Sequence, residues 1–152
     1  MSRLLRLLTI DCDLAVTLSG KVEYQHSLGA LNVSLADTAS VGHALTISDI
    51  TFDLAKDRTL INVEVLQRRD EWEFDPGLKA PTAVTAKARL RLTNVTGHLV
   101  EDSETVRLIR NNGDLCIQLW TETPKQFFAV APQVIAGLSG ESVLVQLWIT
   151  GL

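Results

Sequence analysis

The sequence predicts an all-β fold: an antiparallel β-sandwich or partly open barrel of about 9–11 strands, with at most one short helix. Three observations lead to this prediction. Apolar and polar residues alternate strictly over one long stretch, shorter alternating runs follow one another along the chain, and no apolar pattern of helical period extends over ten residues. A chain of 152 residues with 46 % hydrophobic and 21 % charged residues is typical of one globular unit. We therefore expect a single β domain spanning residues 1–152.

The longest alternation lies between residues 82 and 93 and predicts a strand with two unlike faces. Its apolar positions are Val84, Ala86, Ala88, Leu90 and Leu92, and between them stand Thr85, Lys87, Arg89, Arg91 and Thr93. Successive side chains of a strand point to opposite faces of its sheet. This strand should therefore have one dry face against the core and one solvated, cationic face.

Shorter alternating runs predict the remaining strands. They lie at residues 14–18, 22–25, 28–35, 50–54, 61–65, 95–99, 106–108, 115–120, 127–130 and 143–149. The Asn112-Gly113 pair predicts a tight turn. The apolar parity changes near Asp49, which predicts a β-bulge or a strand break at that point. Residues 132–138 fit one helical turn.

Two of the predicted strands repeat a short motif, Leu-Cys-Ile-Gln-Leu-Trp at residues 115–120 and Val-Leu-Val-Gln-Leu-Trp at residues 143–148. In both, one face is wholly aliphatic and is expected to line the core. The opposite faces carry Gln118, Trp120, Gln146 and Trp148. If the two strands are neighbours, these side chains form a flat patch that can anchor a partner. The alternative is that a loop or the 132–138 segment covers this face.

A second candidate surface is the charged segment at residues 67–81, which contains two prolines and a glycine. Its composition predicts an exposed loop with, at most, a short edge strand. Trp72 and Phe74 stand among its charges, with Arg68 and Arg69 shortly before them. The two aromatic side chains are either surface anchors for a partner or a hydrophobic plug that folds back onto the sheet.

No catalytic or metal-binding motif stands out. His26, His43 and His98 lie on separate segments without the spacing of metal ligands. Asp49 and Asp53 are expected to share a strand face at a separation of about 13 Å, which is too wide for a carboxylate pair acting on one bond. We assign no catalytic residue, no metal and no cofactor, and we favour a non-enzymatic protein. An active site assembled only in three dimensions stays open.

The net charge limits the classes of partner, and the cysteine content indicates the cellular compartment. The net charge of −4 argues against a general nucleic-acid-binding protein, although the Lys87, Arg89 and Arg91 face leaves binding of an anionic polymer open. Cys12 and Cys116 either pair in an oxidising compartment or are small buried hydrophobic residues. We favour the second alternative and a cytoplasmic location. No apolar stretch approaches the roughly 20 residues that span a bilayer, and the first ten residues lack the pattern of a secretion signal.

These observations favour a protein-interaction or assembly domain. It is expected to bind a protein partner, or a second copy of itself, through an exposed sheet edge or a Trp-anchored patch. The residues expected at the contact are Arg68, Arg69, Trp72, Phe74, Gln118, Trp120, Gln146 and Trp148. The alternative function is a barrel or sandwich that encloses a small apolar ligand.

Overall fold

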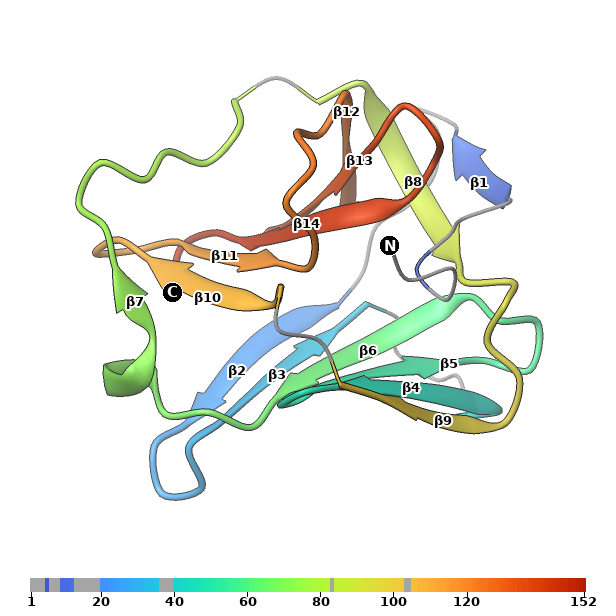
Figure 1. The fold of residues 1–152 in the computed structure, drawn as a ribbon, viewed down its shortest axis with the longest axis horizontal. Helices are drawn as coiled ribbons and strands as arrows, with labels where there is room; N and C mark the ends of the chain where they lie inside the picture. Colours follow the sequence, from blue (N-terminus) through green and yellow to red (C-terminus); the bar gives the residue numbers. More distant parts are fainter. Residues whose placement is uncertain (1–4, 6–8, 13–19, 36–39, 83, 103–104) are drawn as a thin grey trace.

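The computed structural model describes residue 5, the backbone of residues 9–12, and residues 20–35, 40–82, 84–102 and 105–152. These residues form two β-sheets that pack face to face (Figure 1). Helical structure in the described ranges is limited to short 3-10 segments, such as η2 (Arg69–Glu71). The predicted all-β sandwich is therefore confirmed.

The first sheet has eight strands and is the upper layer in Figure 1. In order across the sheet, they are β1 (Thr9–Cys12), β8 (Ala86–Arg91), β12 (Gln126–Ala131), β13 (Val134–Leu138), β14 (Leu144–Ile149), β11 (Leu115–Gln118), β10 (Arg107–Arg110) and β7 (Glu73–Phe74). The predicted Asn112-Gly113 turn joins β10 to β11, which pair as a hairpin.

The second sheet has six strands and forms the lower layer. In order, they are β2 (Lys21–Gln25), β3 (Ala30–Ser34), β6 (Leu60–Val65), β5 (Ile50–Leu54), β4 (His43–Ile47) and β9 (His98–Glu101). The predicted pair of strands at residues 50–54 and 61–65 is the β5–β6 hairpin. The predicted strand at residues 14–18 lies outside the described residues.

Two details of the predicted architecture are wrong. The sheets are mixed, because three of the twelve described strand pairings are parallel: β7–β10, β8–β12 and β4–β9. Each parallel pair joins strands that no hairpin connects, so local turn signals could not reveal it. The strands in the two sheets also outnumber the expected nine to eleven; several have only four residues, and β7 has two.

The apolar parity change near Asp49 and the 132–138 segment both turn out to be parts of hairpins. Ile47 pairs with Ile50, so the predicted break at Asp49 is a two-residue turn between β4 and β5. Ser48 occupies the left-handed region at φ 53 to make this turn. The expected helical turn at 132–138 is wrong: a tight turn after Ala131 leads into β13, which pairs with strands on both sides. Sheet pairing overrides the local pattern here.

The two-faced strand is confirmed in β8. Ala88, Leu90 and Leu92 are 0 %, 2 % and 0 % exposed, whereas Lys87 and Arg89 are exposed. The strand is shorter than its sequence pattern, because it begins at Ala86, and Val84 is 43 % exposed. The dry face of β8 joins the core between the two sheets, whose largest fully buried side chains are Leu31, Leu45, Ile47, Ile50, Phe52, Leu54, Leu90, Leu92, Leu115, Ile117 and Leu119.

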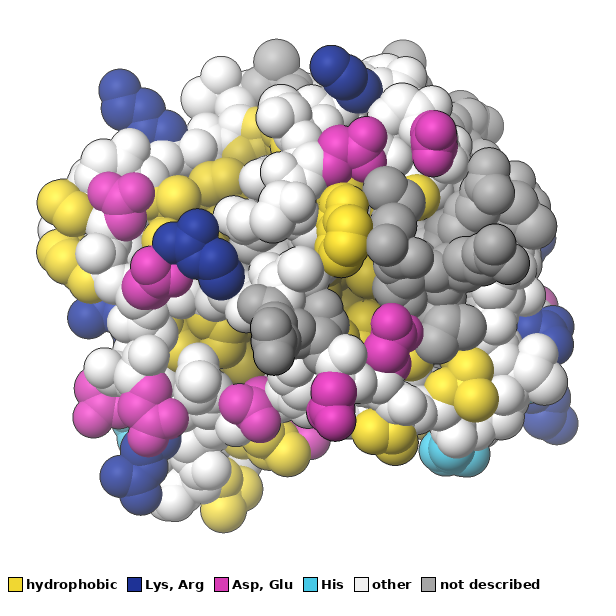
Figure 2. All heavy atoms as spheres, in the orientation of Figure 1, with side chains coloured by type: hydrophobic (Ala, Val, Ile, Leu, Met, Phe, Trp, Pro, Cys, Tyr) yellow, Lys and Arg dark blue, Asp and Glu magenta, His cyan; other side chains and the backbone are white. Residues whose placement is uncertain are grey.

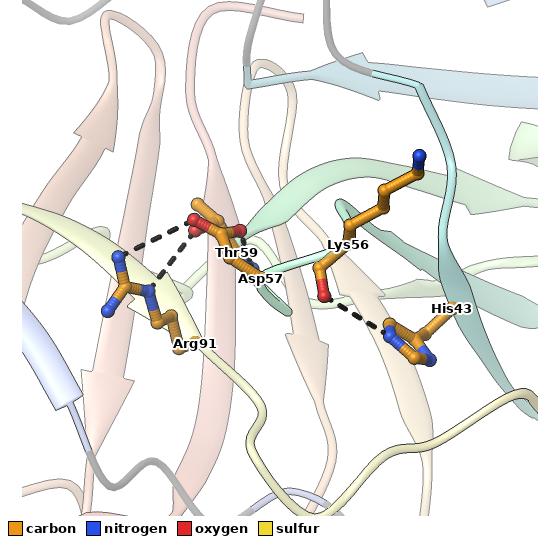
Figure 3. A network of polar contacts seen from close by, with 5 residues as sticks. All are labelled: His43, Lys56, Asp57, Thr59 and Arg91. Atoms are coloured by element: carbon orange, nitrogen blue, oxygen red, sulfur yellow. Dashed lines mark hydrogen bonds and ion pairs between the residues drawn. The ribbon is translucent and has the colours of Figure 1, made fainter.

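Polar contacts join β8 of one sheet to the β5–β6 turn of the other (Figure 3). Arg91 on β8 reaches the β5–β6 turn, where its Nη2 lies 3.5 Å from Asp57 Oδ2 and its Nε donates to Thr59 Oγ1 at 3.4 Å. Thr59 N–H donates to Asp57 Oδ1 at 3.0 Å, and this bond is the largest cause of the lowered pKa of Asp57. A β-bridge between Thr59 and Arg91 adds backbone pairing between the two sheets at this point.

The two faces of β8 provide a stability test with adjacent residues. Leu90→Ala should lower the free energy of unfolding by about 2–5 kcal/mol, because it removes buried methyl groups from the core. Arg89→Ala, one residue away on the exposed face, should change it by less than about 0.5 kcal/mol. Urea denaturation measures both values. Equal losses for the two variants would contradict the assignment of the faces.

Candidate functional site

The strands with the repeated motif are neighbours, but their Trp–Gln face is largely covered. β11 and β14 pair antiparallel, with Gln118 opposite Gln146. Trp148 is only 5 % exposed, and its Nε1–H donates to Gln146 Oε1 at 2.9 Å. Trp120 is half-buried and packs against the core. The expectation that Trp148 anchors an exposed patch is therefore wrong, and the alternative of a covered face fits the structure.

The loop between β11 and β12 contributes to this cover. A Cβ atom placed on Gly137 of β13 would lie 3.1 Å from side-chain atoms of Pro124 and Phe127. Glycine at this position thus allows Pro124 to lie directly on the strand next to β14. The apolar character of this face is used for packing inside the protein.

The two aromatic residues of the charged segment differ in burial. It leaves β6, forms η2 and enters β7, so it passes from the six-stranded to the eight-stranded sheet (Figure 1). Trp72 is 4 % exposed, belongs to the core and donates through Nε1 to Gln67 O at 3.2 Å. Phe74, two residues later, is 51 % exposed. Trp72 is therefore a hydrophobic plug and not a surface anchor, while Phe74 remains available.

The plug is held by the β2–β3 hairpin. Tyr24 Oη accepts a hydrogen bond from the backbone N–H of Arg69 at 2.9 Å. The Tyr24 ring also makes edge contacts with Trp72 at 5.8 Å and with His26 at 4.7 Å between centroids. Arg68 crosses the hairpin turn at Gly29, where a Cβ atom would lie 2.7 Å from Arg68 Cγ. The hairpin and the charged segment are thereby fixed against each other.

An open cleft of about 600 Å³ lies where this hairpin, the charged segment and β10 meet. We call it the arginine cleft, and its lining residues are Tyr24, His26, Ser27, Arg68, Arg69, Asp70 and Arg110. Where Figure 1 places η2, Figure 2 shows acidic and basic side chains next to each other at the lower left. Elsewhere on the face shown in Figure 2, acidic, basic and apolar side chains of the described residues alternate in small groups.

The arginine cleft carries positive charge that the described residues do not neutralise. Its lining residues include three arginines and one aspartate, which together have a net charge of +2 if His26 is left aside. No ion pair within 4.0 Å involves these arginines or Asp70 in the described part of the chain. Arg110 contacts its own surroundings weakly: its guanidinium carbon lies 4.9 Å from the centre of the Phe74 ring, and its Nη1 donates to Asn111 O at 3.4 Å. Arg110 Nε is buried without a hydrogen-bond partner in that part of the chain.

Strand β7, which carries Phe74, is fixed by a bidentate ion pair. Arg107 Nη2 and Nε donate to the two carboxylate oxygens of Glu73 at 2.7 and 3.0 Å. The hydrogen bond from Arg107 is the main reason that the pKa of Glu73 is lowered. A carboxyl whose pKa is lower in the folded protein stabilises the fold at neutral pH, and this contribution is lost as the pH falls through the folded pKa.

Cys116 and His43 are described well enough to assign their state. Cys116 is a free, buried thiol, and burial raises its pKa to about 12, so the thiol stays protonated at neutral pH. His43 Nδ1 accepts from Gly97 N–H at 2.9 Å, which assigns the proton to Nε2 and makes that atom the donor to Lys56 O at 3.3 Å. Among the described residues, no group of three His, Cys, Asp or Glu side chains is placed to hold a metal ion.

The sequence analysis did not predict all the residues that line the cleft. Arg68, Arg69 and Phe74 belong to the predicted contact residues, but Tyr24, His26, Ser27 and Arg110 do not. Tyr24 and His26 are two residues apart at a predicted strand end, a spacing that places both on one face. Arg110 directly precedes the Asn-Asn-Gly turn. These local signals were present, but only the tertiary packing shows that they meet the charged segment.

The other described pockets offer little room for an apolar ligand. One, next to Val22 and Val134, has a volume of about 10 Å³. Another, lined by Asp49, Gln67 and their neighbours, has about 100 Å³ and a mostly polar lining. Neither resembles the predominantly apolar pockets of several hundred Å³ that hold small organic ligands.

Comparison with known proteins adds no family to this description. The chain matches no family model and none of the curated proteins. Within the described ranges, none of the helices combines the length and apolar character that crossing a membrane requires.

Trp72 and Phe74 should respond differently to truncation. Trp72→Ala should lower the free energy of unfolding by about 3–5 kcal/mol, because it empties a buried site next to Tyr24. Phe74→Ala should have a much smaller effect, because half of that side chain is already exposed. Thermal and urea denaturation measure both. A stable Trp72→Ala protein would contradict the role of Trp72 as a plug.

The raised pKa of Cys116 predicts a loss of stability at alkaline pH. The unfolded thiol ionises from about pH 9, whereas the folded thiol stays neutral up to about pH 12, so rising pH stabilises the unfolded state. Over this window the wild type should lose up to about 1.4 kcal/mol per pH unit more than Cys116→Ala. Urea denaturation at several alkaline pH values measures the difference. Parallel curves for the two proteins would show that the thiol is not buried as described.

Proposed function

We propose that this chain is a non-enzymatic protein-interaction domain that binds an acidic partner through the arginine cleft and Phe74. The observation that carries this proposal is the exposed Phe74 ring, which lies against the guanidinium of Arg110. Arg110 lines the cleft together with Arg68 and Arg69, and none of the three has an ion pair in the described structure. Aromatic residues and arginine are enriched where protein interfaces bind most strongly. The predicted contact residues Arg68, Arg69 and Phe74 all belong to this surface.

An apolar residue extends the same surface beyond the cleft. Leu28 is 71 % exposed at the tip of the β2–β3 turn and follows Ser27 of the cleft lining. Apolar side chains next to Arg68 and Arg69 supply area that becomes buried on binding, while the charges orient an acidic partner and speed its encounter. The partner is a different protein or a second copy of this chain.

Two potentially reactive side chains of the described structure have roles within the fold. The Cys116 thiol is protonated at neutral pH and buried. Both ring nitrogens of His43 make hydrogen bonds that join the β5–β6 turn to the segment before β9. These two side chains serve packing and hydrogen bonding within the fold.

A photo-cross-linking amino acid in place of Phe74 tests the proposed function in the cells that make the protein. We expect a defined cross-linked product, whose yield falls at least severalfold when Arg68 and Arg69 are both changed to glutamate, because charge reversal repels an acidic partner. Mass spectrometry identifies the product. A product containing two copies of this chain would identify the partner as the chain itself.

The matched control carries the cross-linker at Val100, which is 80 % exposed on β9. Strand β9 lies at an edge of the six-stranded sheet, so this position samples the alternative of binding by edge pairing. A product at Val100 and none at Phe74 would contradict the proposed surface. A Phe74 product that is insensitive to the glutamate substitutions would contradict an acidic partner.

A further inference from the structure

We propose that the arginine cleft binds a phosphomonoester group carried by the protein partner, such as a phosphorylated side chain. This inference rests on the proposed function and specifies the chemistry of the partner. It is drawn from the charge of the cleft, its hydrogen-bond donors and an unsatisfied atom of Arg110.

The charge of the cleft matches a dianion better than a single carboxylate. The lining has a net charge of +2 without His26, in a protein whose net charge is −4. A phosphomonoester carries about −1.5 to −2 charges near pH 7, so it neutralises this charge almost completely. One carboxylate would leave about half of it uncompensated.

The donors of the cleft also fit the three terminal oxygens of a phosphomonoester. Guanidinium groups bind phosphate through paired, charge-assisted hydrogen bonds, and Arg68, Arg69 and Arg110 all line the cleft. Tyr24 accepts the Arg69 backbone N–H through its oxygen, which leaves its own hydroxyl proton free to donate. Ser27 adds a second hydroxyl.

Arg110 supplies the observation that is independent of charge. Its Nε is buried and has no hydrogen-bond partner in the described part of the chain. A buried donor without an acceptor is costly, and it is uncommon in folded proteins. Because this Nε is closed to solvent, an oxyanion in the cleft can accept from it only when the Arg110 side chain turns toward the cleft that it lines. The guanidinium also rests on the exposed Phe74 ring, so an anion bound there adjoins the apolar part of the proposed contact surface.

Binding of a short peptide to the full chain tests this inference. The probe is a blocked peptide with one phosphoserine between leucines, and the comparison peptide carries serine at the same position. We expect saturable binding of the phosphopeptide, at least roughly tenfold tighter than the serine peptide, because the charged hydrogen bonds are made by phosphate alone. Isothermal titration calorimetry measures the affinities, and NMR follows the Nε–H signal of Arg110.

Three variants locate the bound phosphate. Arg110→Gln should weaken phosphopeptide binding roughly tenfold or more. The double variant Arg68→Gln/Arg69→Gln should do the same, and it guards against a folding defect in Arg110→Gln because these residues lie outside the sheets. Arg89→Gln, on the exposed face of β8, removes the same charge elsewhere and should change the affinity less than about twofold.

The outcomes test separately the phosphate site, the source of the phosphate and the protein-interaction function. Equal affinity for the two peptides, or equal weakening by Arg89→Gln and Arg110→Gln, would overturn the phosphate site. Inorganic phosphate that binds as tightly as the phosphopeptide would assign the cleft to a free phosphate compound and overturn the peptide-borne source. If no phosphate binds but the cross-link at Phe74 depends on Arg68 and Arg69, the protein-interaction function stands and this inference alone fails.

Discussion

The burial of Trp72 is the interaction on which the proposed binding surface depends. The charged segment that contains it connects the two sheets, so its position decides how the β2–β3 hairpin and β10 approach each other. Burying a large aromatic side chain contributes several kcal/mol. The ion pair between Arg107 and Glu73, by contrast, is exposed to solvent and screened by salt. Trp72 therefore fixes the segment, and the ion pair refines the position of β7.

This anchoring explains how a short segment combines structural and binding roles. Trp72 follows the η2 turn directly and precedes β7. Its side chain is buried in the core, whereas Phe74, two residues later in β7, is exposed. The same backbone places the Arg69 N–H on Tyr24 and makes Arg69 part of the cleft wall. The cationic groups are thus presented from a rigid support, which reduces the entropy lost when an anion binds.

Much of the fold follows from the sequence, because a strand with one dry face has an obligatory period of two. The faces of β8 and the β5–β6 hairpin were predicted in this way, and the Asn-Gly pair predicted the turn between β10 and β11. The parallel pairings were not, since they depend on long-range packing. The site was predicted only in part. Arg68, Arg69 and Phe74 lie in one charged segment of the sequence, but Tyr24 and Arg110 come close to this segment only through the fold. Whether Trp72 is a plug or an anchor is decided by the space next to Tyr24, which no local pattern encodes.

Amide hydrogen exchange of Arg69 tests most directly whether the charged segment is held against the hairpin. Its N–H donates to Tyr24 Oη at 2.9 Å, although it lies in a short connecting segment. The account predicts an Arg69 amide that exchanges far more slowly than in an unfolded chain, and faster in Tyr24→Phe. An Arg69 amide that exchanges at the unfolded rate in the wild type would show that the segment is not tethered and that the arginine cleft has no fixed wall.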